Sequence, residues 1–234
     1  MGEVVAVSGS DAHKIANVLR LRSGDDVEIV DSAGTLFDAK LQIDDGVVRA
    51  SLAREHQRAS AVDVVIDVAQ GLPKGAKMDF VVEKLTELGV HAIVPFESER
   101  TVVRDPGPAK LERWRRLARS ASQQSGRRDV PEVRDVLTFQ QLCGAFASYD
   151  LVLFPWEAAS HEPLRLTLPQ LLEPARRILV VIGPEGGLSH AEADRASSAG
   201  ATVVSLGPRV LRTETAGMMV LSVLLYLTDR KPAG

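Results

Sequence analysis

Two short segments of the sequence combine residues that can bind a ligand or carry out chemistry. Residues 183–187 contain three glycines and a proline, and residues 206–216 contain Arg209, Arg212 and Glu214. A glycine-rich turn leaves its backbone N–H and C=O groups open to close approach by a ligand. An arginine keeps its charge and can stabilise a developing negative charge or hold a phosphate. The two segments together favour a ligand held by backbone groups beside a cationic centre.

Each segment also has a purely structural interpretation. Glycine and proline occur in most turns between strands and helices. Thr213 can cap the helix that follows, and Glu214 is favoured in a first helical turn by the helix dipole. Arg212 has no comparable structural reason, so it is the first candidate for a chemical role. The glycine turn matches neither the dinucleotide fingerprint G-x-G-x-x-G nor the phosphate loop G-x-x-x-x-G-K-[ST], which argues against NAD and ATP.

The elements around these segments predict that both lie at one edge of a sheet. Runs of apolar, largely β-branched residues predict strands at residues 62–70, 91–96, 150–154, 177–182 and 201–206. Helical spacing of apolar residues predicts a helix that ends at Gly89, a long helix from Pro108, and helices at residues 189–198 and 213–228. Strands that alternate with helices are typical of a mostly parallel α/β sheet, where ligands bind at the carboxyl ends of the strands.

The first 60 residues predict a separate, β-rich unit. A strand at residues 4–7 and a short helix capped by Ser10 come first. Three β-rich runs follow at residues 26–31, 34–43 and 46–53, separated by turns at residues 32–34 and 44–46. Short strands joined by tight turns indicate a small barrel. The polar segment at residues 54–61 marks the boundary, so we expect domains at residues 1–60 and 61–234.

Composition excludes several classes of protein. With 45% hydrophobic and 25% charged residues, the chain of 234 residues has an ordinary globular composition. The single cysteine, Cys143, rules out a disulfide framework, and the five scattered histidines offer no metal-ligand spacing, so we expect no metal. No apolar stretch is long enough to span a membrane, and the start lacks the pattern of a secretory signal. We therefore expect a cytoplasmic protein that does not bind a membrane.

Positive charge is concentrated in the middle of the chain. The formal net charge is −3, yet residues 70–134 carry 13 basic and 9 acidic side chains. Many of these basic residues gather on and just beyond one predicted helix: Arg113, Arg115, Arg116, Arg119, Arg127 and Arg128. A charged helix face is usually only solvated, but a local excess of positive charge is also what phosphate contact requires.

Six segments, in the same order along the chain, resemble the motifs of one known family. They read HKIANVLRLRSGD (13–25), KGAKMDFVVEKLTELGV (74–90), FESERT (96–101), SQQSGRRDVPEV (122–133), GPEGGLS (183–189) and LGPRVLRTETA (206–216). On these motifs the chain resembles the bacterial 16S ribosomal RNA uridine-N3 methyltransferases, the ribosomal small-subunit methyltransferase E family of the SPOUT superfamily. The resemblance covers nearly the whole sequence.

This resemblance implies an α/β, trefoil-knotted SPOUT methyltransferase domain with a small N-terminal PUA-like β-barrel. Members usually begin further upstream, with a strand of that barrel, so we expect the barrel to lack its first strand here. The cofactor implied is S-adenosyl-L-methionine, bound where three loops of the knot meet. The cofactor-binding residues that match are Phe154, Pro155, Gly183, Glu185, Gly186, Gly187, Leu206, Gly207, Leu211 and Thr215.

The resemblance also implies roles in catalysis and RNA binding. Arg212 is expected to stabilise negative charge on the uracil or to hold a phosphate, and Glu214 and Glu185 are alternative proton acceptors. The implied partner is 16S ribosomal RNA or the small ribosomal subunit. The residues expected to contact it are Arg20, Arg22, Lys74, Lys77, Arg100, Arg116, Arg119, Arg127 and Arg128.

A homodimer is implied as well, with the apolar segment 218–227 contributing to its interface. Two rival interpretations stay open at this point. The first is a SPOUT methyltransferase that acts on a ribose 2′-hydroxyl of transfer or ribosomal RNA. The second is a non-catalytic RNA-binding or assembly protein that uses the barrel and the basic helix.

Overall fold

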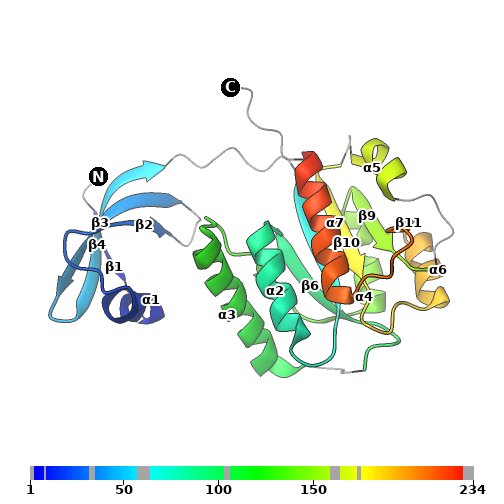
Figure 1. The fold of residues 1–234 in the computed structure, drawn as a ribbon, viewed down its shortest axis with the longest axis horizontal. Helices are drawn as coiled ribbons and strands as arrows, with labels where there is room; N and C mark the ends of the chain where they lie inside the picture. Colours follow the sequence, from blue (N-terminus) through cyan, green and yellow to red (C-terminus); the bar gives the residue numbers. More distant parts are fainter. Residues whose placement is uncertain are drawn as a thin grey trace. The chain divides into compact units, whose positions relative to one another are not determined.

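The chain divides into two compact units, Met1–Ala61 and Val62–Gly234 (Figure 1). The computed structural model describes residues 3–7, 9–31, 35–56, 64–102, 106–158, 164–172 and 175–228. The turn predicted at residues 32–34 lies outside this set, as does most of the segment predicted as the domain boundary. Each unit is described below by itself.

The N-terminal unit is a four-stranded antiparallel sheet. Its strands are β1 (Val4–Val7), β2 (Asp26–Val30), β3 (Leu36–Asp44) and β4 (Val47–His56), in the spatial order β1-β4-β3-β2. Asp45 and Gly46 both have positive φ, 47° and 77°, which is the backbone of the tight hairpin turn predicted between β3 and β4. A small core lies beneath the sheet and is built on Ala39, Leu41, Val48 and Ala50.

A short helical segment follows β1 in this unit. Helix α1 (Gly9–His13) continues into a π-helical turn, η1 (Lys14–Val18). Ser10 is the predicted cap of this helix; the helix begins one residue earlier, at Gly9, and the side chain of Ser10 lies outside the described part of the structure. Gly9 has φ of 63°, so it makes the sharp turn out of β1 and leaves Ser10 inside the first turn.

The C-terminal unit is built on a seven-stranded sheet whose pairings are all parallel. The strand order is β11-β9-β10-β5-β6-β7, and β8 also pairs with β6. The strands are β5 (Val65–Gly71), β6 (Ala92–Glu97), β7 (Glu132–Val133), β8 (Leu137–Thr138), β9 (Leu151–Pro155), β10 (Arg177–Ile182) and β11 (Thr202–Val204). The prediction of a parallel α/β sheet is confirmed.

Helices cover both faces of this sheet, so its strands are buried on either side. One face packs against α2 (Lys77–Leu88), α3 (Gly107–Ser125), α5 (Leu164–Leu172) and α7 (Thr213–Thr228). The other packs against α4 (Phe139–Gly144) and α6 (His190–Ser198), with a 3₁₀ turn at Phe146–Ser148. Along β10, Ile178 and Val180 point to the first core, and Leu179 and Val181 point to the second.

Several predicted helix ends are confirmed. Helix α2 ends at Gly89, whose φ of 110° gives the left-handed cap that glycine favours. Helix α6 begins with a capping box, in which the Ser189 side chain accepts from the Glu192 N–H and the Glu192 carboxylate accepts from the Ser189 N–H. The sequence did not predict α4, α5, β7 or β8, since these elements are short or have no clear apolar period.

The path of the chain after β9 positions the site. Strand β10 lies on one side of β9 and β11 on the other, so β11 is an edge of the sheet. Helix α7 nevertheless packs on β5 and β10 and beside α2 (Figure 1). Residues 205–212 must therefore bring the chain back from the edge, past the carboxyl ends of β9 and β10.

Candidate functional site

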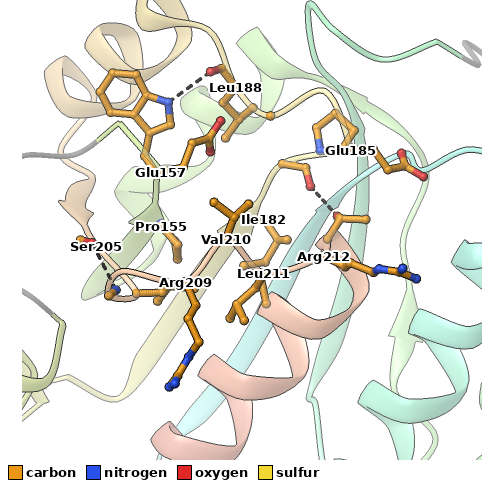
Figure 2. A pocket seen from close by; sticks show the side chains of 18 of the residues that line it. Pro155, Glu157, Ile182, Glu185, Leu188, Ser205, Arg209, Val210, Leu211 and Arg212 are labelled. Atoms are coloured by element: carbon orange, nitrogen blue, oxygen red, sulfur yellow. Dashed lines mark hydrogen bonds between the residues drawn. The ribbon is translucent and has the colours of Figure 1, made fainter.

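A cavity of about 500 Å³ lies at the carboxyl ends of β9, β10 and β11 (Figure 2). Three stretches of chain form most of its wall: residues 155–157, 182–188 without Gly186, and 205–213. The glycine turn and the arginine-containing segment are thus neighbours, as the strand pattern predicted. Of the predicted cofactor-binding residues, those that line it are Pro155, Gly183, Glu185, Gly187, Leu206, Gly207 and Leu211.

The glycine turn is packed so closely that side chains would not fit. The N–H of Gly187 donates to the Pro184 carbonyl across 2.9 Å, and Gly187 has φ of 69°. A Cβ atom at Gly183 would lie 2.9 Å from Cγ of Leu188. One at Gly71, where β5 ends, would lie 2.6 Å from Cδ of Pro184. The glycines are therefore required by the close approach of the turn to its neighbours.

Glu185 anchors this turn to the start of α2. Its carboxylate accepts from Nζ of Lys77 at 2.7 Å and from the backbone N–H of Lys74 at 3.2 Å. Burial alone would raise the pKa of Glu185, but these bonds and one from its own backbone N–H hold that pKa below its ordinary value. A carboxylate with a lowered pKa is a poor proton acceptor. The positive charge of Lys77 is already paired with this carboxylate. The geometry therefore favours an anchoring role for both residues over proton transfer and phosphate contact.

Arg209 and Arg212 are the basic residues that the returning segment brings to the cavity. The Arg212 carbonyl accepts from the N–H groups of Thr215 and Ala216, each at 2.9 Å, and so starts helix α7. Its side chain lines the cavity and is exposed, as is that of Arg209 (Figure 2). Within the described part of the chain, no ion pair is present for either guanidinium. Both charges are therefore available to a ligand.

Four other predicted site residues do not line the cavity. Side chains alternate along β9, so Phe154 points into the core, where its ring lies 6.4 Å from that of Phe139. Helical geometry turns Glu214 and Thr215 away from the cavity wall; one carboxylate oxygen of Glu214 is buried and meets no hydrogen-bond partner among the described residues. Gly186 faces outward, and its carbonyl accepts from Arg100 at 3.0 Å.

Three residues of the cavity wall, Trp156, Glu157 and Ser205, are not among the predicted cofactor-binding residues, although the resemblance also matches the loop 154–157 to which two of them belong. The Trp156 indole donates to the Leu188 carbonyl at 3.1 Å and so closes one side. The Glu157 carboxylate occupies the space that a Cβ at Gly187 would need. Ser205 accepts from the Gly207 N–H at 3.2 Å. Trp156 and Glu157 directly follow the predicted Phe154 and Pro155, whereas Ser205 could be found only by its position after a strand.

The residues predicted to bind RNA fall into two groups. Arg116, Arg119 and Arg128 are exposed, and no ion pair of theirs is found in the described part of the chain. Arg127 differs from these three arginines, because it has partners within the protein. Its side chain is only 13% exposed, donates to the Thr86 carbonyl at the end of α2 at 2.7 Å, and pairs with Asp129. It satisfies a helix terminus, so it is not free for phosphate.

The remaining predicted RNA contacts are all on the surface. Arg20 and Arg22 are exposed in the N-terminal unit, and Arg20 has an unusual positive φ of 53°. Lys74 and Arg100 are exposed beside the glycine turn. Their exposure is compatible with phosphate contact and does not test it.

The described residues offer neither a metal site nor a membrane-spanning helix. Among them, no three His, Cys, Asp or Glu side chains come together as a metal would require. None of the described helices has the length and apolarity needed to cross a membrane.

Known proteins similar to this chain share both its units. Residues 61–225 match the family model of the RNA methyltransferase domain, and residues 7–47 match that of the RNA methyltransferase PUA domain. A protein of Bacillus subtilis named ribosomal RNA small subunit methyltransferase E is 34% identical, over 96% of this chain and 90% of its own length. One of Mycobacterium bovis with the same name is 32% identical, over 98% and 88%.

Solved structures agree with these matches. The ribosomal RNA small subunit methyltransferase E of Neisseria gonorrhoeae, bound to S-adenosyl methionine, superposes with a TM-score of 0.87 at 30% identity, covering 97% of this chain and 92% of that one. A putative methyltransferase of Legionella pneumophila, in complex with the bound cofactor SAM, gives 0.85 at 30% identity, with 97% and 93% covered. The chain belongs to this family of RNA methyltransferases, that of the ribosomal RNA small subunit methyltransferases E.

Proposed function

We propose that this protein transfers the methyl group of S-adenosylmethionine to N3 of a specific uridine in the 16S ribosomal RNA of the small ribosomal subunit. The observation that supports it most directly is the meeting of the glycine turn and Arg212 at one cavity, in a chain whose relatives bind S-adenosylmethionine. The activity would be cytoplasmic and independent of metal.

The cavity fits this cofactor in size and chemistry. Its volume of about 500 Å³ is typical of a site for a small molecule. Ile182, Leu206 and Leu211 offer apolar surface for an adenine ring, beside loops whose backbone groups can bind its edge. Glu157 and Arg209 supply opposite charges, which suit the ammonium and carboxylate of the methionine part.

The proposed reaction depends mainly on placement and on one positive charge. When bound, S-adenosylmethionine supplies a methyl group on a sulfonium, a good leaving centre. Uridine N3 must lose its proton as the new N–C bond forms. Arg212 would stabilise the negative charge that then develops on the uracil oxygens, so that the proton can pass to solvent. Glu185 is held in its ion pair and Glu214 lies off the cavity, which leaves neither well suited to accept that proton.

The exposed cations outside the cavity would hold the RNA. Arg116, Arg119 and Arg128 on and after α3 can contact phosphates, as can Arg20 and Arg22 of the PUA unit. We further propose that this unit closes into a PUA-like β-barrel, with the two domains at residues 1–60 and 61–234.

The knot and the homodimer complete the proposal. The return of the chain from edge strand β11 to α7, over β10 and β5, is the path that a trefoil knot would need. Helix α7 exposes apolar side chains to solvent, with Met219 38%, Leu227 48% and Tyr226 84% exposed. Burial of such a patch against a second copy would be favourable, and we propose a dimer formed through it.

Methyl transfer to RNA that lacks the modification tests the function. Purified protein, labelled S-adenosylmethionine and either free 16S RNA or assembled small subunits would be combined, and the product nucleosides analysed. N3-methyluridine at a single position is the expected product. A 2′-O-methyl nucleotide would instead support the ribose-methylating rival. RNA binding without any transfer would support an assembly protein.

A further inference from the structure

A buried chain of hydrogen bonds connects the two halves of the cavity wall from behind. Gln70, near the end of β5, is 0% exposed and lies beside Ile182 in the parallel register. Its amide Nε2 donates to Oγ1 of Thr213 at 2.8 Å and to the Gly71 carbonyl at 3.0 Å. The Thr213 hydroxyl donates in turn to the Gly183 carbonyl at 2.5 Å. Strand β5, the glycine turn and the first residue of α7 are thereby joined.

Which group donates in each of these hydrogen bonds follows from the number of protons available. A threonine hydroxyl has one proton, and the Gly183 carbonyl can only accept, so the proton of Thr213 goes to that carbonyl. Gln70 must therefore present its NH₂ group, and not its oxygen, to Thr213. The amide orientation is set by its partners.

This arrangement is not the most stable one that the site could hold. With its NH₂ group engaged, Gln70 leaves Oε1 buried, and no hydrogen-bond partner for that oxygen exists among the described residues. A buried acceptor without a partner is destabilising. The Gln70 side chain lies close to Gly217. A Cβ atom added at Gly217 would lie 3.7 Å from Oε1 of Gln70 and 3.7 Å from Cγ1 of Ile182. An apolar side chain of similar volume would fill this space without leaving an unpaired oxygen, so stability alone does not account for Gln70.

Two of the residues that these hydrogen bonds join belong to the cavity. Gly183 and Thr213 line it, and Thr213 directly follows Arg212. A displacement of either would change the distance between the glycine turn, on the cofactor side, and Arg212, on the uracil side. We propose that Gln70 is a positioning residue, which holds Arg212 in register with the cofactor-binding turn through Thr213 and Gly183. This inference rests on the proposed function.

Two pairs of variants test it. Gln70→Met removes the donor and the unpaired oxygen together at similar volume, and Thr213→Val removes the hydroxyl at constant shape. Gln70→Met is expected to keep the melting temperature of the unaltered protein, whereas Thr213→Val should lower it, because the Gly183 carbonyl and the Gln70 amide each lose a partner. Both are expected to lower kcat at least tenfold, since a misplacement of roughly 1 Å can reduce rates about 10²-fold. Thr213→Ser keeps the hydroxyl and is expected to recover most of the loss seen with Thr213→Val. Ser122→Ala, which removes another buried unpartnered oxygen on α3, controls for the effect on stability.

A pH profile separates positioning from packing. In Gln70→Glu the ionised carboxylate cannot donate to Thr213, but the protonated acid can. The activity of this variant relative to the unaltered protein should therefore rise as the pH falls, while Gln70→Met shows no such rise.

The outcomes distinguish failure of this inference from failure of the function. If the unaltered protein binds S-adenosylmethionine and methylates RNA, and Gln70→Met and Thr213→Val both keep its kcat, the positioning role is overturned alone. If Gln70→Met does not fold, the comparison of Thr213→Val with Thr213→Ser decides the question. If the unaltered protein binds no S-adenosylmethionine in calorimetry, both proposals are overturned.

Discussion

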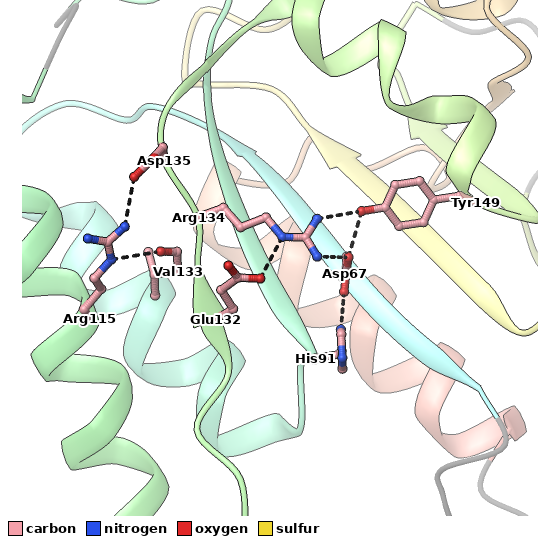
Figure 3. A network of polar contacts seen from close by, with 8 residues as sticks. All are labelled: Asp67, His91, Arg115, Glu132, Val133, Arg134, Asp135 and Tyr149. Carbon is pink, nitrogen blue, oxygen red and sulfur yellow. Dashed lines mark hydrogen bonds and ion pairs between the residues drawn. The ribbon is translucent and has the colours of Figure 1, made fainter. Parts of the chain in front are cut away.

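At the amino-terminal end of the parallel sheet Asp67 lies buried among His91, Tyr149 and Arg134, whereas at the carboxyl end Arg209 and Arg212 line a cavity without an ion pair in the described chain (Figures 2 and 3). Asp67 is 1% exposed and accepts from Nδ1 of His91 and from the Tyr149 hydroxyl, each at 2.7 Å. Arg134 lies 3.2 Å from the same carboxylate.

The groups around Asp67 are themselves partnered. Arg134 also donates to Glu132 at 3.0 Å and to the Tyr149 oxygen at 3.1 Å, and the guanidinium of Arg177 lies 5.4 Å from the centre of the Tyr149 ring. Burial alone would raise the pKa of Asp67, but hydrogen bonds from His91 and Tyr149 and the charge of Arg134 keep that pKa below its ordinary value.

The difference between the two ends separates stability from function within one sheet. Charges that are paired and buried are closed to ligands, and the loss of one partner destabilises the folded state. Charges left without partners beside a cavity contribute little to folding but remain available for binding or catalysis. Substitutions at the two ends should therefore have different effects, on stability at one end and on turnover at the other.

Removal of the acid at the amino-terminal end should have the largest effect. Asp67→Ala leaves His91, Tyr149 and Arg134 without their common partner and should lower the free energy of unfolding by about 3–5 kcal/mol. Denaturant titration measures the change, with Glu132→Ala, at an exposed partner, as a control of small effect. At a temperature where Asp67→Ala stays folded, kcat should be unchanged; a large loss of kcat would mean that the two ends are coupled.

Removal of the unpaired cation at the carboxyl end should act on turnover instead. Arg212→Ala is expected to lower kcat by roughly 10²-fold, the effect of losing one electrostatic donor, while the free energy of unfolding changes by under about 0.5 kcal/mol. Calorimetry should find binding of S-adenosylmethionine nearly unchanged. If Arg212→Ala unfolds the protein, or methylates RNA normally, the catalytic assignment is wrong.

The glycine turn offers a matched pair of substitutions. Gly187→Ala and Gly200→Ala both place a side chain at positive φ, 69° and 97°, and each should lose about 1 kcal/mol of stability. A methyl group at Gly187 would also displace the Glu157 carboxylate, whereas none of the described atoms lies within 4 Å of such a group at Gly200. Only Gly187→Ala should weaken binding of S-adenosylmethionine. Equal affinities in the two variants would show that the turn does not contact the cofactor.

Helix α3 and the turn after it repeat the contrast between paired and unpaired charges. Arg119→Ala should weaken RNA binding and reduce its salt slope by roughly one unit, as expected for one lost phosphate contact, without a change in melting temperature. Arg127→Ala should lower the melting temperature, because the Thr86 carbonyl loses one of its two donors and keeps only the Gly89 N–H, and leave the salt slope as it was. A smaller salt slope at an unchanged melting temperature in Arg127→Ala would instead indicate that Arg127 contacts RNA.

The smallest expected effect is a dependence of stability on pH. The hydrogen bond to Asp67 raises the pKa of His91 above 6.5, more than burial lowers it. His91 therefore stabilises the fold fully below pH 6.5, and this contribution should disappear as the pH rises through the raised pKa. The effect should be small, because the side chain is 49% exposed. Denaturant titrations at a series of pH values from 6 to 9 would measure the free energy of unfolding, and its dependence on pH should be weaker in His91→Gln. A free energy of unfolding that rises with pH in the unaltered protein would contradict the assignment.

The main elements of the C-terminal unit, and the position of the site along the chain, can be predicted from the amino-acid sequence alone. Apolar runs predicted β5, β6, β9, β10 and β11, and helical spacing predicted α2, α3, α6 and α7. These patterns are local, since a strand or an amphipathic helix repeats its apolar residues within a few positions. Because ligands bind at the carboxyl ends of parallel strands, the same patterns placed the glycine turn and Arg212 together.

Which side chains are paired and which are open to a ligand depends on the three-dimensional fold. Tyr149 and Asp67 are 82 positions apart, and Thr213 and Gln70 are 143 apart. No local period relates such residues, because their contact depends on the order of strands in the sheet. For the same reason the sequence could not separate Arg127, which caps α2, from Arg119, which is exposed. The chemistry of each arginine is set by the backbone that folding brings next to it.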